Sequence, residues 1–229
     1  MAKGSVGFYG KLPIVGDFIT RRLPKDFINA LDQWMQSGVS VSKEELGEQW
    51  LDLYLTSPIW RFAFQPGLCG ESAWAGIMMP SVDRVGRYYP MILACQIFEP
   101  NNLSFVLTDC GDWFARLEEI ALAGLEEQYN MEGFNEAVLD LELPELEKKL
   151  QVKNTGIDDQ LSTHLFSEVE VDEQSSNNDI LILATLQAMC KNGDRYSLWL
   201  NLGSDSEKGA IKIFKGLPTG HDYSGMIAY

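Results

Sequence analysis

The stretch Trp74-Ala-Gly-Ile-Met-Met-Pro80, Ser81-Val-Asp-Arg-Val-Gly-Arg-Tyr-Tyr-Pro90, Met91-Ile-Leu-Ala-Cys-Gln-Ile-Phe98 places two apolar runs around a polar loop. A third apolar run, Trp60 to Leu68, precedes them, and turns that carry Gly or Pro separate the three. Aromatic and apolar runs separated by such turns are typical of neighbouring antiparallel strands. The stretch therefore predicts a three-stranded meander, in which the loop Ser81 to Pro90 joins the last two strands.

Two helices are predicted on the N-terminal side of this meander. Val6 to Gly10 favours a short strand and Lys11 to Asp17 a loop, because proline and glycine punctuate the second segment. Pro24 opens an amphipathic helix, and a second helix is expected from Ser42, as its N-cap, to Thr56.

The C-terminal half is predicted to form helices and then strands. Helices are expected within residues 103–129, where Asp109 or Asp112 can cap a restart, and within 134–150. Residues 153–179 are mostly polar and predict a loosely packed connection. Strand-like runs follow at 180–189, 196–202 and 210–214, and the Asn-Gly pair at 192–193 predicts a hairpin between the first two.

The composition suits one large domain over residues 1–229, because 45% apolar content is enough for a core. The net charge is −15, and residues 99–180 hold four Lys/Arg against twenty Asp/Glu. Such a chain repels phosphate backbones and anionic lipid, so nucleic acid and membrane surfaces are not expected as partners. The acidic section is either a solvated face or a docking surface for a basic partner.

The compartment is predicted from what the sequence lacks. No apolar run approaches the roughly 20 residues that span a bilayer, and the N-terminal residues lack the hydrophobic stretch of a secretory signal. A cytoplasmic protein without membrane insertion is therefore expected. Cys69, Cys95, Cys110 and Cys190 are widely spaced, which favours reduced, buried thiols over a disulfide framework.

Patterns that carry catalysis are hard to find. Gly7-Phe-Tyr-Gly10-Lys11 follows a predicted strand, but it lacks the four-residue gap and the Ser/Thr of a phosphate-binding loop. His164 and His221 are the two histidines of the chain, and neither has the spacing to other ligands that a metal site needs. No catalytic residue, metal or cofactor is therefore expected.

The loop Ser81 to Pro90 is the candidate site, because it gathers one acid, two arginines and two tyrosines. Asp83 is expected to pair with Arg84, Arg87 or Arg61 and so to fix the shape of the loop.

Aromatic residues supply candidates for contact with a partner. Tyr88 and Tyr89 can each offer an amphipathic contact point. Trp60, beside Arg61, can stack at a sheet edge.

An alternative keeps chemistry open at the two loops. A nucleotide- or phosphate-binding switch or enzyme would use side chains of the segments 11–17 and 81–90 around a phosphate. The residues in question are Lys11, Asp17, Asp83, Arg84 and Arg87.

Three blocks of the sequence resemble the type VI secretion-associated TagF/ImpM family. The first is Gly7-Phe-Tyr-Gly-Lys-Leu-Pro-Ile-Val-Gly-Asp-Phe18 with Arg21 and Leu23-Pro24. The second is Ser57-Pro-Ile-Trp-Arg-Phe62, and the third is Pro80 to Pro90. The order and spacing of the blocks over the first ~90 residues are similar to those of the family, whereas the acidic middle section does not align by eye.

The resemblance implies a function and a fold. The implied function is that of a non-catalytic, cytoplasmic accessory protein of a bacterial type VI secretion system, which represses the system after translation by binding a forkhead-associated scaffold protein. Some members carry a fused phosphatase domain, and this chain shows no phosphatase metal motif. The implied fold is an α/β, longin- or profilin-like sandwich with a mainly antiparallel central sheet and helices on both faces.

Candidate residues for partner binding or loop bracing follow from the loops and the blocks together. They are Lys11, Asp17, Arg21, Trp60, Arg61, Ser81, Asp83, Arg84, Arg87, Tyr88 and Tyr89.

Overall fold

One antiparallel sheet forms the centre of the protein. The computed structural model describes residues 4–98, 106–107, 109–126, 130–144, 169–171, 194–204 and 207–229. In these ranges eight strands pair in the order β2-β1-β5-β4-β3-β7-β8-β6, and every neighbouring pair is antiparallel. The strands are β1 (Gly7–Gly10), β2 (Ile19–Arg21), β3 (Trp60–Phe64), β4 (Ala73–Met79), β5 (Met91–Ile97), β6 (Val169–Val171), β7 (Tyr196–Ser204) and β8 (Glu207–Lys215).

The meander predicted from the central stretch is confirmed. β4 pairs with β3 on one side and with β5 on the other, in register from Ala73 opposite Ile97 to Met79 opposite Met91. β1 extends the sheet beside β5, and β7 extends it beside β3. Every residue of β3 and β4 is buried. Strands that are covered on both faces have near-continuous apolar sequences, which explains why these strands could be predicted from the sequence.

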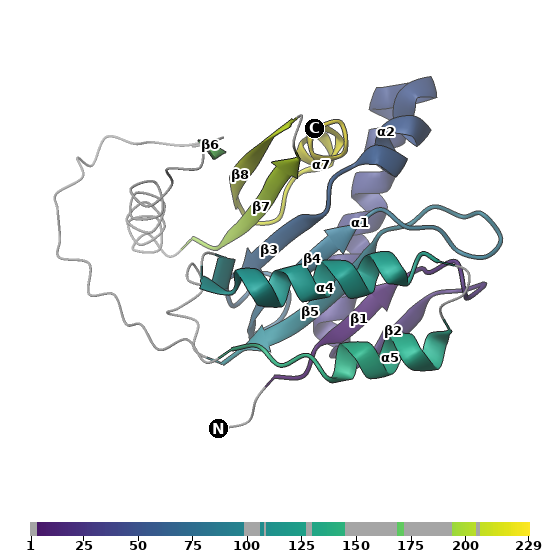
Figure 1. Ribbon diagram of the computed structural model, residues 1–229. Coiled ribbons are helices and arrows are strands. Elements are labelled where there is room, and N and C mark those ends of the chain that lie inside the picture. The colour runs from purple at the N-terminus through teal and green to yellow at the C-terminus, as the bar shows by residue number, and fades with distance from the viewer. Residues whose placement is uncertain are drawn as a thin grey trace, which may run out of the picture.

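Helices cover both faces of the sheet (Figure 1). α1 (Lys25–Leu46), α2 (Trp50–Thr56) and α7 (Gly220–Ile227) pack on one face, and α4 (Gly111–Ala123) and α5 (Met131–Leu139) pack on the other. Side chains alternate along β3, so Phe62 faces α1 whereas Ala63 faces α4. The α/β fold with an antiparallel sheet between two helical layers is thus confirmed.

The first helix is longer than predicted. α1 continues through Ser42, and the 3-10 turn Gly47–Gln49 then leads into α2. Ser42 is not an N-cap, because its hydroxyl donates to Val39 O at 3.1 Å and accepts a hydrogen bond from Trp50 Nε1 at 2.9 Å. A serine bonded back to the preceding turn is accommodated inside a helix. α1 ends instead before Gly47, whose φ of 52° favours glycine.

Two other helix starts also differ from the prediction. No side chain caps the start of α4, so the proposed caps Asp109 and Asp112 are wrong. α5 begins at Met131 rather than at residue 134, because the Asn130 side chain accepts a hydrogen bond from Gly133 N at 2.7 Å.

Among the described residues of the C-terminal part, a helix and a strand were not predicted. α7 begins with a capping box, in which the Thr219 and Asp222 side chains each accept a hydrogen bond from the other's backbone N–H. β6 pairs with β8 inside the segment 153–179 that was expected to be a connection. β7 and β8 confirm the runs 196–202 and 210–214. The predicted strand 180–189 and the Asn-Gly turn lie outside the described residues.

Candidate functional site

The loops 11–17 and 81–90 meet at one end of the sheet (Figure 1). The Ser81 hydroxyl donates to Lys11 O at 2.7 Å, which joins the bases of the two loops. Nearer the tip, Arg84 N donates to Val15 O at 2.9 Å, and Arg87 Nη2 donates to Gly16 O at 2.8 Å. The two loops are therefore packed against each other by direct hydrogen bonds.

Asp83 lies at the centre of this contact and is only 2% exposed. Its Oδ1 accepts hydrogen bonds from Val85 N at 3.0 Å and from Arg87 N at 2.9 Å. Its Oδ2 accepts from Arg87 Nε at 2.6 Å and lies 3.0 Å from Lys11 Nζ. All four donors converge on one carboxylate, so the side chain is held as the anion.

Electrostatics agree with this geometry. Burial by itself would raise the pKa of Asp83, because it removes water from the charged form. The hydrogen bonds from Arg87, Lys11 and Val85 outweigh burial and hold the pKa of Asp83 well below its usual range. Asp83 therefore stays ionised, and its contacts with Lys11 and Arg87 brace the two loops.

The structure selects among the expected partners of Asp83. Arg87 forms the predicted ion pair, and Lys11, which was not expected in this role, forms a second one. Arg84 contributes its backbone rather than its side chain, since its exposed guanidinium lies beside Gly16, where an added Cβ would be 3.4 Å from Nη2.

Arg61 serves another part of the protein. From β3 it reaches α4, where Nε and Nη2 donate to the two carboxylate oxygens of Glu118 at 2.6 and 3.0 Å. The guanidinium also lies 5.1 Å from the centre of the Phe114 ring. Arg61 is 5% exposed, so it joins the sheet to the helix behind it.

Tyr54 of α2 holds the base of the second loop. Its hydroxyl donates to Ser81 O and accepts from Ser81 N, both at 3.0 Å. Ser81 O also accepts a hydrogen bond from Tyr89 N at 3.0 Å, and an isolated bridge links Val82 to Tyr88. The loop is thus a narrow hairpin fixed to both the sheet and α2.

Two tyrosines share one carboxylate next to this hairpin. The hydroxyls of Tyr9 and Tyr89 each donate to Asp32 Oδ1 on α1 at 2.6 Å. Burial raises the pKa of both tyrosines, and the hydrogen bond to Asp32 raises it further. Phe18 covers the pair, with its ring centre 5.8 Å from that of Tyr9 and 4.9 Å from that of Tyr89, and stays 42% exposed.

The two loop tyrosines therefore face the interior. Tyr89 is 6% exposed, and the half-buried Tyr88 packs its ring against Trp50 and Tyr54. Trp60 is fully buried in β3, between β4 and β7, and its Nε1 donates to Met226 O at 3.1 Å. The expectation that Trp60 stacks at a sheet edge is wrong.

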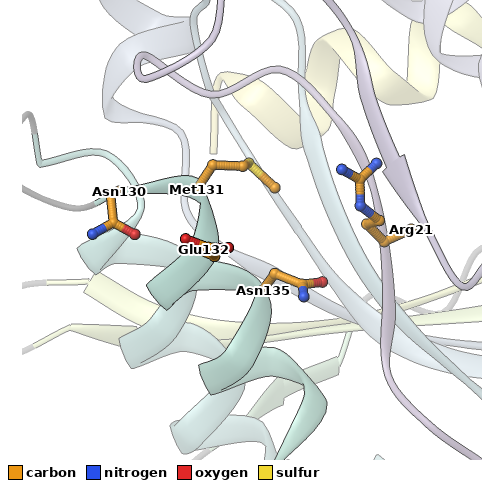
Figure 2. Close-up of a pocket in the computed structure, with 5 residues that line it drawn as sticks. All are labelled: Arg21, Asn130, Met131, Glu132 and Asn135. Carbon is orange, nitrogen blue, oxygen red and sulfur yellow. The ribbon is translucent and has the colours of Figure 1, made fainter.

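Arg21 and Asp17 are exposed and lie outside the Asp83 cluster. Arg21, on β2, borders a pocket of about 520 Å³ with four residues at the start of α5: Asn130, Met131, Glu132 and Asn135. Figure 2 shows Arg21 on the opposite side of this pocket from Asn130. Asp17 accepts a hydrogen bond from Phe18 N at 2.8 Å. Asp17 is therefore not among the partners of Asp83, although the phosphate-binding alternative places both side chains around one phosphate.

Sequence reasoning missed Tyr9, Phe18, Asp32 and Tyr54. Asp32 and Tyr54 lie on helices. The spacing of apolar residues along a helix does not indicate which polar atom points inward. Tyr9 and Phe18 belong to the first of the three blocks, and that block was the available signal. In the described ranges, no three His, Cys, Asp or Glu side chains gather as they would around a metal ion.

Comparisons with known proteins agree with this architecture. The family model described as the TagF N-terminal domain, type VI secretion system-associated, matches residues 7–141. The chain is also similar to PA0076 from Pseudomonas aeruginosa PAO1, whose crystal structure superposes with a TM-score of 0.75. The two are 36% identical, and the match covers 97% of this chain and 94% of PA0076. No curated protein matches at a significant level.

The sheet, its two helical layers and the family match define a type VI secretion system accessory protein. The chain belongs to the TagF family. Among the helices that the structure describes, none combines the length and apolarity of a membrane span.

Proposed function

We propose that this protein is a non-catalytic, cytoplasmic repressor of a type VI secretion system that acts after translation by binding a forkhead-associated scaffold protein. Membership of the TagF family, which is described as type VI secretion system-associated, supports the secretion-system role. The scaffold as partner comes from the family resemblance of the three sequence blocks.

The observation that favours binding over chemistry is the state of the Asp83 cluster. Lys11 and Asp83 are both nearly inaccessible, and their charges neutralise each other at 3.0 Å. A phosphate-binding switch would need such a lysine to face the ligand. Because Lys11 is buried against Asp83, the alternative of a nucleotide or phosphate site at these loops is disfavoured.

Rigid loops suit a repressor that works by occupancy. A partner that binds a pre-organised surface loses little conformational freedom of that surface, so more of the contact energy remains as affinity. The protein would compete with assembly of the secretion apparatus simply by holding the scaffold.

Co-purification and secretion assays test the proposal. Tagged protein should retain the cognate forkhead-associated scaffold in a pull-down, and overexpression should lower export of a type VI effector while the scaffold's abundance is unchanged. Absence of both effects would contradict the proposal. A thermal shift screen with nucleotides, phosphate and divalent metals tests the alternative, which requires stabilisation by one of them.

A further inference from the structure

The tip of the hairpin between β4 and β5 projects away from the packed cluster. Val85 is 66% exposed, the largest exposed fraction among the large apolar side chains that the structure describes. Gly86 adopts φ of 85°, and a Cβ at this position would meet no atom within 4 Å. The tip is therefore open to solvent on the side where a partner could approach.

Phe18 brings a second exposed apolar group from the neighbouring loop. It is 42% exposed and rests on Tyr89, which belongs to the hairpin itself. Gly16, two residues earlier, contacts the hairpin through Arg84 and Arg87. Phe18 and the tip are thus carried by two loops that are bonded together.

Arg84 and Asp17 are the charged side chains of the two loops that form no ion pair with the described residues. Lys11 and Arg87 both pair with Asp83, so these three side chains together keep one positive charge. Within the described part of the chain, the exposed Arg84 guanidinium has neither an ion pair nor a side-chain hydrogen bond. Over the two loops, the three cations Lys11, Arg84 and Arg87 stand against the two acids Asp17 and Asp83. In a protein with a net charge of −15, a locally positive surface with exposed apolar groups favours an acidic partner.

The surface is also held in one shape. The backbone of Arg84 is bonded to Val15 O, and the Asp83 side chain accepts hydrogen bonds from the backbone on both sides of Gly86. Arginine at the centre of a pre-ordered contact is a frequent source of binding energy at interfaces.

We propose that Arg84, Val85 and Phe18 form the contact surface for an acidic segment of the scaffold protein, with a carboxylate on Arg84 and an apolar side chain against Val85 and Phe18. The inference rests on the proposed function, because it names the surface through which that partner is bound. It assigns Asp83, Lys11 and Tyr89 to bracing and leaves contact to residues that have exposed side chains.

Surface plasmon resonance with the immobilised, purified cognate scaffold tests the inference. The variants are Arg84→Glu, Arg84→Lys, Val85→Asp and, as a matched control, Leu122→Asp on α4, where the wild-type leucine is 51% exposed. Arg84→Glu and Val85→Asp should each weaken binding by at least about 10-fold, whereas Leu122→Asp should leave it unchanged. Arg84→Lys should retain part of the affinity, because it keeps the charge but loses the planar fork.

Salt gives a second measure of the same contact. Raising NaCl from about 50 to about 300 mM should weaken the wild-type complex more than the Arg84→Glu complex, because the ion pair is screened. Unchanged melting temperatures would show that the variants are folded.

The outcomes separate the inference from the proposed function. If wild type binds and the two tip variants bind equally well, the surface is wrong while the scaffold remains the partner. Equal loss of binding in Leu122→Asp would also overturn the assignment to the tip. If wild type does not bind, the proposed function fails and the inference falls with it.

Discussion

Arg61 of β3 and Glu118 of α4 form a two-pronged ion pair between the sheet and its helical cover, with N–O distances of 2.6 and 3.0 Å. The arginine is 5% exposed, so water hardly reaches its guanidinium and the Glu118 carboxylate compensates its positive charge. Glu118→Ala should therefore destabilise the protein by about 3–5 kcal/mol, because it leaves a buried guanidinium unpaired.

Urea unfolding of Glu118→Ala measures this cost. The matched control is Glu119→Ala, one residue along α4, where the ion pair with Arg116 is exposed. Exposed pairs contribute about 0–1 kcal/mol, so this variant should unfold almost as wild type does. Similar costs for the two variants would contradict the structural role of Arg61.

Asp83 should make the protein sensitive to acid. Its pKa in the folded state is held below the ordinary value of about 3.9, so its contribution to stability is present above pH ~4. That contribution is lost as the pH falls further, because the unfolded chain takes up the proton first. Asp83→Asn should lower stability at pH 7 and flatten the pH dependence below ~4, measured by thermal unfolding between pH 2.5 and 7 (roughly).

A second substitution at Lys11 tests whether Asp83 stabilises the fold through its ion pair with this lysine. Asp83→Asn leaves the 5% exposed Lys11 without its counter-charge, whereas Asp83→Asn combined with Lys11→Met removes both charges. The double variant should recover part of the lost stability. If the single variant has wild-type stability and acid response, Asp83 is not the brace described above.

The contact between α1 and α7 should not tolerate a methyl group at Gly38. A Cβ there would lie 2.8 Å from the ring of Tyr223, which is 1% exposed. Gly38→Ala should cost about 1–3 kcal/mol through overpacking. Gly225→Ala on α7 is the control, because its Cβ meets nothing within 4 Å, and it should stabilise the helix by up to about 1 kcal/mol.

Thermal denaturation of the two glycine variants tests this packing. A shift of the melting temperature downward for Gly38→Ala and a small shift upward for Gly225→Ala is expected. An unchanged or higher melting temperature for Gly38→Ala would show that α1 and α7 are not in close contact at this position.

Alkaline pH should destabilise the fold through buried tyrosines. Burial raises the pKa of Tyr9, Tyr54, Tyr89 and Tyr223 above the ordinary value. The unfolded chain therefore loses protons first, and stability falls as the pH rises above ~10. Absorbance titration at about 295 nm should show Tyr9, Tyr54, Tyr89 and Tyr223 ionising only on unfolding. Ionisation of all eight tyrosines in the folded protein would contradict the burial of the Asp32 cluster.

The fold was largely predictable because its central strands are covered on both faces. Almost every residue is buried in the three central strands, Trp60–Phe64, Ala73–Met79 and Met91–Ile97. Strands of this kind can be recognised from their apolar composition alone. Helix boundaries were predicted less well where a polar residue fits more than one role. Ser42 matched an N-cap pattern, yet its hydroxyl accepts a hydrogen bond from Trp50 Nε1 of the next helix. The local sequence does not encode this tertiary contact.

The site was predictable only in part, because the residues of the Ser81 to Pro90 loop were named whereas Tyr9, Phe18, Asp32 and Tyr54 were not. The sequence predicted that Asp83 pairs with Arg84, Arg87 or Arg61, and the structure selects Arg87. That Lys11 joins it, and that Tyr9 and Tyr89 share Asp32, depends on β1 lying beside β5 and on α1 crossing them. Contacts between segments more than 20 residues apart are set by packing of the whole domain. The domain boundaries and the closer likeness to longin or profilin folds stay predictions.

Isothermal titration calorimetry of the purified protein with its cognate forkhead-associated scaffold tests the central claim most directly. The account predicts saturable binding that weakens as salt is raised and survives removal of nucleotides and divalent metals. Contradiction would come from a flat titration with folded proteins, above all if the same preparation were stabilised by a nucleotide or by phosphate.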